Sequence, residues 1–172
     1  EVLIHVPVSV RDASEPGVGL MYGHGFFGGR EALDTDRARQ ISDELGAVMV
    51  AIDWWGMSQR DLPALLTDLT SDPVDAVNFH QRVQQSIVNW IVLADALDEI
   101  AALPELARPD SGPGSGDGSL AGQPLMELSR GRVFMGISQG HILGGVLAAV
   151  LPDLQRAVLN VGGAGLSHMM FR

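Results

Sequence analysis

The chain contains no cysteine and no lysine among its 172 residues. The absence of cysteine excludes disulfide bonds, a thiol nucleophile and zinc–thiolate sites. The absence of lysine excludes a Ser–Lys catalytic dyad and Schiff-base chemistry, so all 11 basic residues are arginines. No apolar run reaches the roughly 18 residues that a membrane-spanning helix needs. No group of His, Asp and Glu has metal-ligand spacing, so we expect no metal site.

Acidic residues outnumber basic ones by 21 to 11, which gives a formal net charge of −10. This balance argues against nucleic acids and anionic membrane surfaces as partners. The hydrophobic fraction of 46% is that of an ordinary globular protein, and the length suits one domain with a substantial core. We therefore expect a single domain over residues 1–172.

The most informative motif is the G-x-S-x-G pattern at residues 136–140, with Ser138 at its centre. An apolar run at residues 132–135 predicts a buried strand before it, and residues 142–150 predict a buried helix after it. A nucleophile elbow needs this order of strand, sharp turn and helix. The glycines would leave room where strand and helix crowd the turn, which holds the serine in a strained conformation.

A second glycine motif lies far upstream, where a predicted strand at residues 18–22 runs into Gly23-His24-Gly25-Phe26-Phe27-Gly28-Gly29. In serine hydrolases, a His-Gly loop after an early strand supplies half of the oxyanion hole. Gly25 would let the backbone turn so that the N–H of Phe26 points at the developing oxyanion. The second donor would be the N–H of Gln139, directly after the nucleophile. Losing one such donor costs about 3 kcal/mol of transition-state stabilisation.

In these two motifs and their order the chain resembles the α/β-hydrolase family. Residues 53–58 and 155–163 add weaker similarity, so the resemblance covers nearly the whole chain. It implies a three-layer α/β-hydrolase fold with a mostly parallel sheet. It also implies a serine esterase or lipase-like enzyme without a cofactor, which cleaves a small-molecule or lipid-like ester. Ser138 would be the nucleophile, with Phe26 and Gln139 as oxyanion donors and His24 and Gly25 as the supporting loop.

Two other functions stay open. Gly23, Gly25 and Gly28 also satisfy G-x-G-x-x-G, the fingerprint of Rossmann-type dinucleotide-binding domains, with Asp53 as the ribose ligand. Asp53 lies 25 residues after Gly28, beyond the usual spacing of about 20. The phenylalanines would crowd a pyrophosphate, and the elbow would have no role. The third possibility is a hydrolase-like domain without catalysis, which serves as a binding or scaffold domain.

The remaining apolar runs and turn-forming segments predict the order of the other helices and strands. Strands are expected at residues 2–10, 47–52 and 156–161, and a long helix at residues 77–103. Residues 104–124 are expected to be a flexible insertion rich in Gly, Pro and Ser. Residues 57–72 are either a lid or an irregular surface loop, and we favour the loop. We expect His141 to be structural, because it follows the elbow too closely to reach back to Ser138.

The position of the elbow near the end of the chain predicts an incomplete enzyme. In α/β-hydrolases the triad acid and then the histidine follow the nucleophile in the sequence. After Ser138 the chain offers only Asp153 as an acid, and His168 as a histidine besides His141. Asp153 precedes the last expected strand and His168 comes too early. We therefore expect truncation after that strand, with a further polypeptide segment or second chain completing sheet and triad. The absence of an initial Met favours a processed, secreted or cell-envelope protein.

Overall fold

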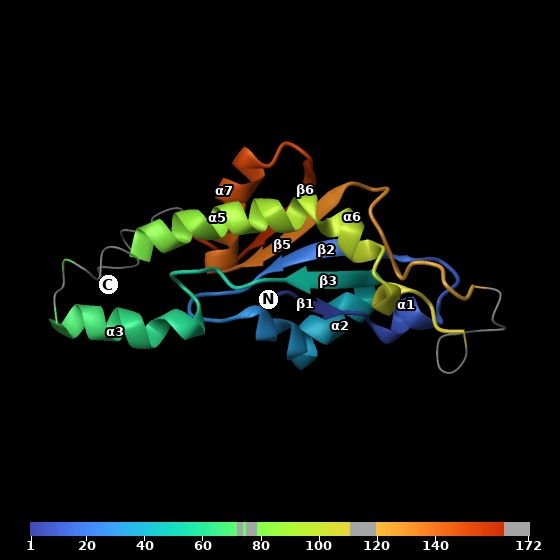
Figure 1. The fold of residues 1–172 in the computed structure, drawn as a ribbon, viewed down its shortest axis with the longest axis horizontal. Coiled ribbons are helices and arrows are strands. Elements are labelled where there is room, and N and C mark those ends of the chain that lie inside the picture. The colour runs from blue at the N-terminus through green and yellow to red at the C-terminus, as the bar shows by residue number, and fades with distance from the viewer. Residues whose placement is uncertain (72–73, 75–78, 111–119, 164–172) are drawn as a thin grey trace.

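The structure is a computed structural model that describes residues 1–71, 74, 79–110 and 120–163. Its elements alternate between strands and helices around one central sheet (Figure 1). The strands are β1 (Leu3–His5), β2 (Gly17–Gly23), β3 (Ala47–Ala51), β4 (Met126–Glu127), β5 (Arg132–Ile137) and β6 (Leu154–Asn160). The α-helices are α1 (Val8–Asp12), α2 (Asp36–Leu45), α3 (Leu62–Ser71), α5 (Phe79–Asp95), α6 (Leu97–Ala101) and α7 (Gln139–Val150), and the 3-10 helices are η1 (Arg30–Asp34), η2 (Gln59–Asp61) and η3 (Pro104–Leu106).

The sheet has the order β1-β3-β2-β5-β6, and β4 pairs with the beginning of β2. Every pairing is parallel except that of β1 with β3, which is antiparallel. β2 therefore lies between β3 and β5. The chain passes from β2 to β3 on one side of it, and later forms β5 on the other side. This confirms the expected α/β class with a mostly parallel sheet.

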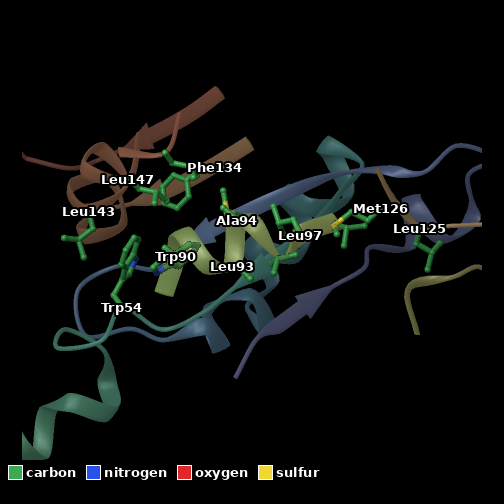
Figure 2. Packing of buried hydrophobic residues seen from close by; sticks show 14 of the residues in the cluster. Trp54, Trp90, Leu93, Ala94, Leu97, Leu125, Met126, Phe134, Leu143 and Leu147 are labelled. Carbon is green, nitrogen blue, oxygen red and sulfur yellow. The ribbon is translucent and has the colours of Figure 1, made fainter. Parts of the chain in front are cut away.

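Helices cover both faces of the sheet. On one face α5, α6 and α7 bury side chains such as Trp90, Leu97 and Leu147 against the strands (Figures 1 and 2). On the other face η1 and α2 contribute Leu33 and Ile41 to a smaller cluster. Thr35 caps α2 by accepting the N–H of Ala38 at 3.3 Å, and Gly46 ends the helix with φ of 56°.

Three aromatic rings form the part of the core beneath the ends of β2 and β5. Trp54 and Trp90 are stacked with centroids 4.5 Å apart, and Phe134 packs edge-on against both (Figure 2). All three side chains are fully buried. A Cβ at position 23 would lie 2.7 Å from the Phe134 ring, so the end of β2 can pack this closely against the cluster only because residue 23 is glycine. The rings thus fix the position from which the loop after β2 departs.

Several sequence expectations need correction. The strand expected at residues 2–10 is wrong beyond His5, because the chain turns at Pro7 and residues 8–12 form α1. The favoured loop at residues 57–72 is also wrong, because this segment contains η2 and α3. Leu62, Leu65, Leu66 and Leu69 have helical spacing, a signal that could have found α3. No α3 residue is buried, so the leucine spacing indicates the helix but does not predict that its side chains stay accessible to solvent.

Two expected segments lie partly outside the described residues. The long helix expected at residues 77–103 is divided into α5 and α6, and residues 77–78 are not described. Residues 111–119 of the expected insertion are not described either. Its two ends pair with each other, because Arg108 donates its N–H to Gln123 O at 2.8 Å and Leu125 donates to Leu106 O at 2.7 Å. No helix in the described part of the chain is long and apolar enough to cross a membrane.

Candidate active site

The strand order creates a switch point at the carboxyl end of β2. The chain connects β2 to β3 on one side, whereas β5 pairs with β2 on the other, in a register that places Gly23 opposite Gly136. In open α/β sheets, ligands bind where the strand order reverses, just outside the carboxyl ends of the strands. The loop that follows β2 and the turn that follows β5 both leave the sheet here. The topology therefore brings the two sequence motifs to one edge.

Ser138 stands in a sharp turn between β5 and α7. Its backbone has φ of 56° and ψ of −111°, a left-handed conformation that costs a non-glycine residue about 1–3 kcal/mol. The turn is held because Ser138 donates its N–H to Asn160 O on β6 at 3.0 Å. The side chain is half-buried, and its hydroxyl makes no hydrogen bond to a described residue. The strained turn that the motif predicts is thus present.

The two glycines of the motif are required by close approach. A Cβ at Gly136 would overlap the Gly140 carbonyl group and would lie 2.8 Å from the Phe134 ring. A Cβ at Gly140 would overlap the Gly23 carbonyl group and would lie 2.9 Å from the carbonyl oxygen of His24. The first turn of α7 is therefore pressed against the end of β2. Only glycine allows the strand, turn and helix to pack this closely.

The loop after β2 is fixed by backbone hydrogen bonds to residues 57–59. Phe27, which has φ of 49°, donates its N–H to Met57 O at 3.1 Å, and Gln59 donates to Gly28 O at 2.7 Å. Within the loop, Gly28 donates to Gly25 O at 3.0 Å. These contacts hold Gly25 against the elbow, where a Cβ on Gly25 would lie 3.6 Å from the Ser138 Cβ. The structure thus brings Gly25 and Ser138 together.

Two backbone donors beside Ser138 remain uncommitted. The N–H groups of Phe26 and Gln139 form no hydrogen bond with any described residue, although their neighbours Phe27 and Ser138 are both bonded. Gln139 is the first residue of α7, where N–H groups have no partner within the helix. The helix dipole also favours negative charge at this end. These groups are therefore available to an oxyanion.

His24 braces the loop. Its ring is fully buried, and Nε2 accepts the N–H of Trp54 at 2.9 Å. Nδ1 lies 2.8 Å from Gly25 O, which assigns the ring proton to Nδ1 as the donor to that carbonyl. Burial lowers the pKa of His24, although the hydrogen bond to Gly25 opposes this shift. Both nitrogens are thus occupied in a neutral ring, which leaves no nitrogen to act as a base for Ser138.

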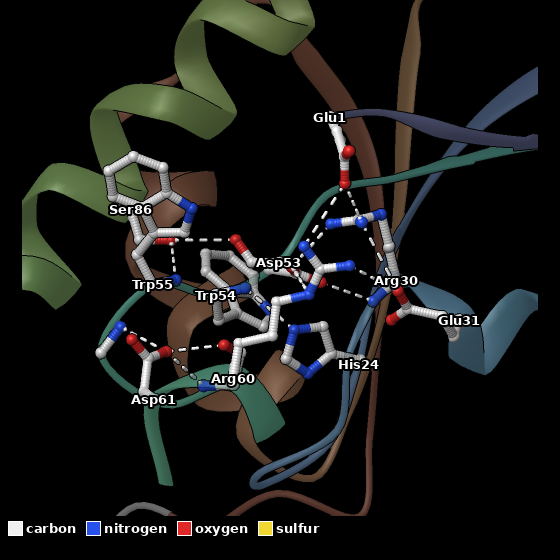
Figure 3. A network of polar contacts seen from close by, with 12 residues as sticks. Glu1, His24, Arg30, Glu31, Asp53, Trp54, Trp55, Arg60, Asp61 and Ser86 are labelled. Carbon is white, nitrogen blue, oxygen red and sulfur yellow. Dashed lines mark hydrogen bonds and ion pairs between the residues drawn. The ribbon is translucent and has the colours of Figure 1, made fainter. Parts of the chain in front are cut away.

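Asp53 and Arg30 form a second brace, which the sequence motifs did not reveal. The side chains of Asp53 and Arg30 are 6% and 11% exposed. The Asp53 carboxylate accepts the backbone N–H of Arg30 at 2.8 Å and its guanidinium at 2.7 Å (Figure 3). This pair fastens the end of the glycine loop to the end of β3. Asp53 is engaged by this arginine, which argues against its role as a free ribose ligand in a dinucleotide site.

The residues downstream of Ser138 do not complete a triad within the described chain. His141 accepts the N–H of Gly162 on Nδ1 at 2.9 Å and so holds the loop after β6. Asp153 precedes β6 and pairs with Arg132 at 3.0 Å, whereas Ser138 is bonded to the far end of the same strand. His168 lies outside the described residues. No described group of three or more His, Asp or Glu could hold a metal ion.

The side chain of Gln139 is a further feature that the sequence did not reveal. It is only 2% exposed, yet neither its amide oxygen nor its amide nitrogen has a hydrogen-bond partner among the described residues. A buried polar group without a partner is unusual, and a catalytic role is one of its recognised explanations. Gln139 therefore has two groups without a described hydrogen-bond partner, its backbone N–H and its side-chain amide.

Two comparisons with known proteins identified no relative of this chain. A scan against protein-family models matched none of them, and a search of the curated proteins found none with significant similarity.

Proposed function

We propose that this chain is a serine hydrolase of the α/β-hydrolase type that cleaves carboxylic esters through an acyl-enzyme on Ser138. The observation that carries the proposal is the strained serine between β5 and α7, located at the switch point of the sheet and packed against a glycine loop. A left-handed conformation at a non-glycine residue is costly, and such strain gathers at active sites. This strain favours the proposal over a dinucleotide site or a scaffold domain.

The proposed reaction assigns one task to each group. The Ser138 hydroxyl oxygen attacks the ester carbonyl carbon, and its proton passes to a general base. The carbonyl oxygen becomes negative and accepts the N–H groups of Phe26 and Gln139. Collapse of this intermediate expels the alcohol, which takes up the proton, and leaves the acyl group on Ser138. Water then attacks the acyl-enzyme by the same steps and releases the carboxylic acid.

The surroundings support preorganised oxyanion binding. Phe26 is held in a loop fixed by hydrogen bonds on its next two residues, and Gln139 is held by α7. Donors that are fixed before the reaction need no reorganisation when charge develops. The general base and its acid are assigned to no described residue: both ring nitrogens of His24 are bonded to backbone groups, and Nδ1 of His141 accepts the N–H of Gly162.

Active-site labelling tests the proposal. In a protein that has the whole catalytic apparatus, a fluorophosphonate probe should label Ser138, and hydrolysis of a short-chain p-nitrophenyl ester should be lost in step with labelling. Ser138→Ala should abolish both signals. Ser14→Ala is the matched control, because Ser14 is an exposed serine outside the site, and this variant should keep both. Labelling that survives in Ser138→Ala would refute the assignment. A folded protein that has the whole catalytic apparatus but shows neither labelling nor hydrolysis would favour a non-catalytic domain.

A further inference from the structure

A cavity of about 550 Å³ lies beside the end of β3, apart from the elbow. Its apolar wall is formed by Ile52 and by Val92, Leu93 and Ala96 on and after α5. Its polar wall includes Glu1, Arg30, Asp53 and Arg60 at one end, and Asp61 and Arg82, which pair with each other at 2.8 Å. Ser138, Phe26 and Gln139 are not among the lining residues, so the cavity is separate from the proposed catalytic groups. Its volume is in the range of small-molecule sites.

A fixed cation stands at the polar end. The Arg30 guanidinium is 11% exposed and is held by the buried Asp53 carboxylate at 2.7 Å. The backbone N–H of Arg30 donates to the same carboxylate, so both ends of the residue are anchored (Figure 3). A guanidinium fixed in this way needs little ordering when an anion binds to its remaining N–H groups. The site therefore offers a preorganised donor beside an apolar wall.

A carboxylate from the chain itself already occupies this position. The Glu1 side chain pairs with the Arg30 guanidinium and with Arg60 Nη1, the latter at 3.3 Å (Figure 3). The Glu1 side chain is 71% exposed, and the Arg60 side chain is 59% exposed. Water screens the exposed side chains of Glu1 and Arg60, which weakens the ion pairs that they form. An external carboxylate could therefore displace Glu1 while Asp53 keeps Arg30 in place.

The apolar wall is open to solvent beside this carboxylate position. Val92 is 59% exposed and Val2 is 46% exposed, although both line the cavity. An apolar surface next to a pair of guanidinium groups fits a ligand with an anionic head and a hydrocarbon tail. We infer that the cavity binds a medium-chain aliphatic carboxylate, with its head between Arg30 and Arg60 and its tail along α5. The inference stands independently of the proposed esterase activity.

The fluorescence of Trp55 can report binding in the cavity. Its side chain lines the cavity and is 49% exposed, whereas the other two tryptophans of the chain are fully buried. Titration of the full-length protein with decanoate should change the tryptophan fluorescence and saturate. The change should be absent in Trp55→Phe. Decanol, which has the tail without the carboxylate, should bind at least roughly tenfold more weakly, as expected for the loss of a charge-assisted contact.

Two substitutions separate a carboxylate site from a general apolar surface. Arg60→Gln should weaken decanoate binding by roughly tenfold or more, whereas Glu1→Gln should strengthen it because the internal competitor loses its charge. Arg39→Gln is the matched control, since Arg39 is a similarly exposed arginine that pairs with Asp34 instead. It should leave the affinity unchanged. Equal binding of decanol and decanoate, or equal affinities in Arg60→Gln and Arg39→Gln, would overturn the inference.

Discussion

The glycines of α7 allow a direct test of the site geometry. A Cβ at Gly140 would overlap the Gly23 carbonyl oxygen and would lie 2.6 Å from the Gly23 carbonyl carbon. Since non-bonded carbon atoms are most stable about 3.5–4.0 Å apart, the start of α7 would have to move from β2 by roughly 1 Å. Gly145, five residues further along the same helix, has open space around it, with only Leu159 Cδ1 at 4.0 Å.

The two positions should therefore respond in opposite directions to the same substitution. Gly140→Ala should destabilise the fold by about 1–3 kcal/mol, as overpacking of a tight contact does. Gly145→Ala should stabilise it by about 0.5–1 kcal/mol, because alanine favours the helix and meets no obstacle. Urea unfolding followed by circular dichroism measures both free energies, and an unchanged m-value would show that the unfolded states are comparable.

The same pair of variants tests the chemistry. Movement of the first turn of α7 displaces both Ser138 and the N–H of Gln139, and a misplacement of about 1 Å can cost on the order of 100-fold in rate. Gly140→Ala should therefore label far more slowly with a fluorophosphonate, whereas Gly145→Ala should label at the parent rate. If Gly140→Ala proved as stable as Gly145→Ala, the close contact between α7 and β2 would be refuted. Destabilisation without slower labelling would refute the role of that contact in the site.

Three further substitutions test the strain and the braces. Ser138→Gly should be more stable than Ser138→Ala by about 1 kcal/mol in urea unfolding, because glycine adopts a positive φ without a steric penalty; equal stability would argue against strain at the elbow. The pKa of His24 is lowered below 6.5 by burial, so the unfolded state binds more protons below that pH, and stability should fall as the pH drops from about 6.5 toward the folded-state pKa. His24→Gln should reduce this fall, and an identical pH dependence in both proteins would contradict the buried neutral ring. Asp53→Asn should cost about 3 kcal/mol in thermal or urea unfolding, because Arg30 loses its buried partner, and a neutral effect would show that Glu1 and Glu31 suffice to hold the guanidinium.

Local patterns in the sequence determined the elements around the site. Residues 18–22, 47–52 and 133–137 are runs without a charged side chain, which are typical of strands in a parallel sheet, and the structure has β2, β3 and β5 there. The glycine spacing around Ser138 predicted a strained turn because only glycine tolerates neighbours so close, and the serine has a positive φ. Such features depend on residues a few positions apart, and they can be read without knowledge of the fold.

The tertiary structure decided which distant residues meet and what they do there. The pairing of β2 with both β3 and β5 brings Gly25 to Ser138, and no local pattern specifies that neighbour relationship. The sequence suggested His24 as part of a supporting loop and Asp53 as a possible ribose ligand. The contacts that make both residues braces come from Trp54 and Arg30, which reach them across the chain. Hydrogen-bond partners of buried groups are set by packing between elements. The sequence therefore determined the local shape of the elbow, whereas long-range packing decided its surroundings.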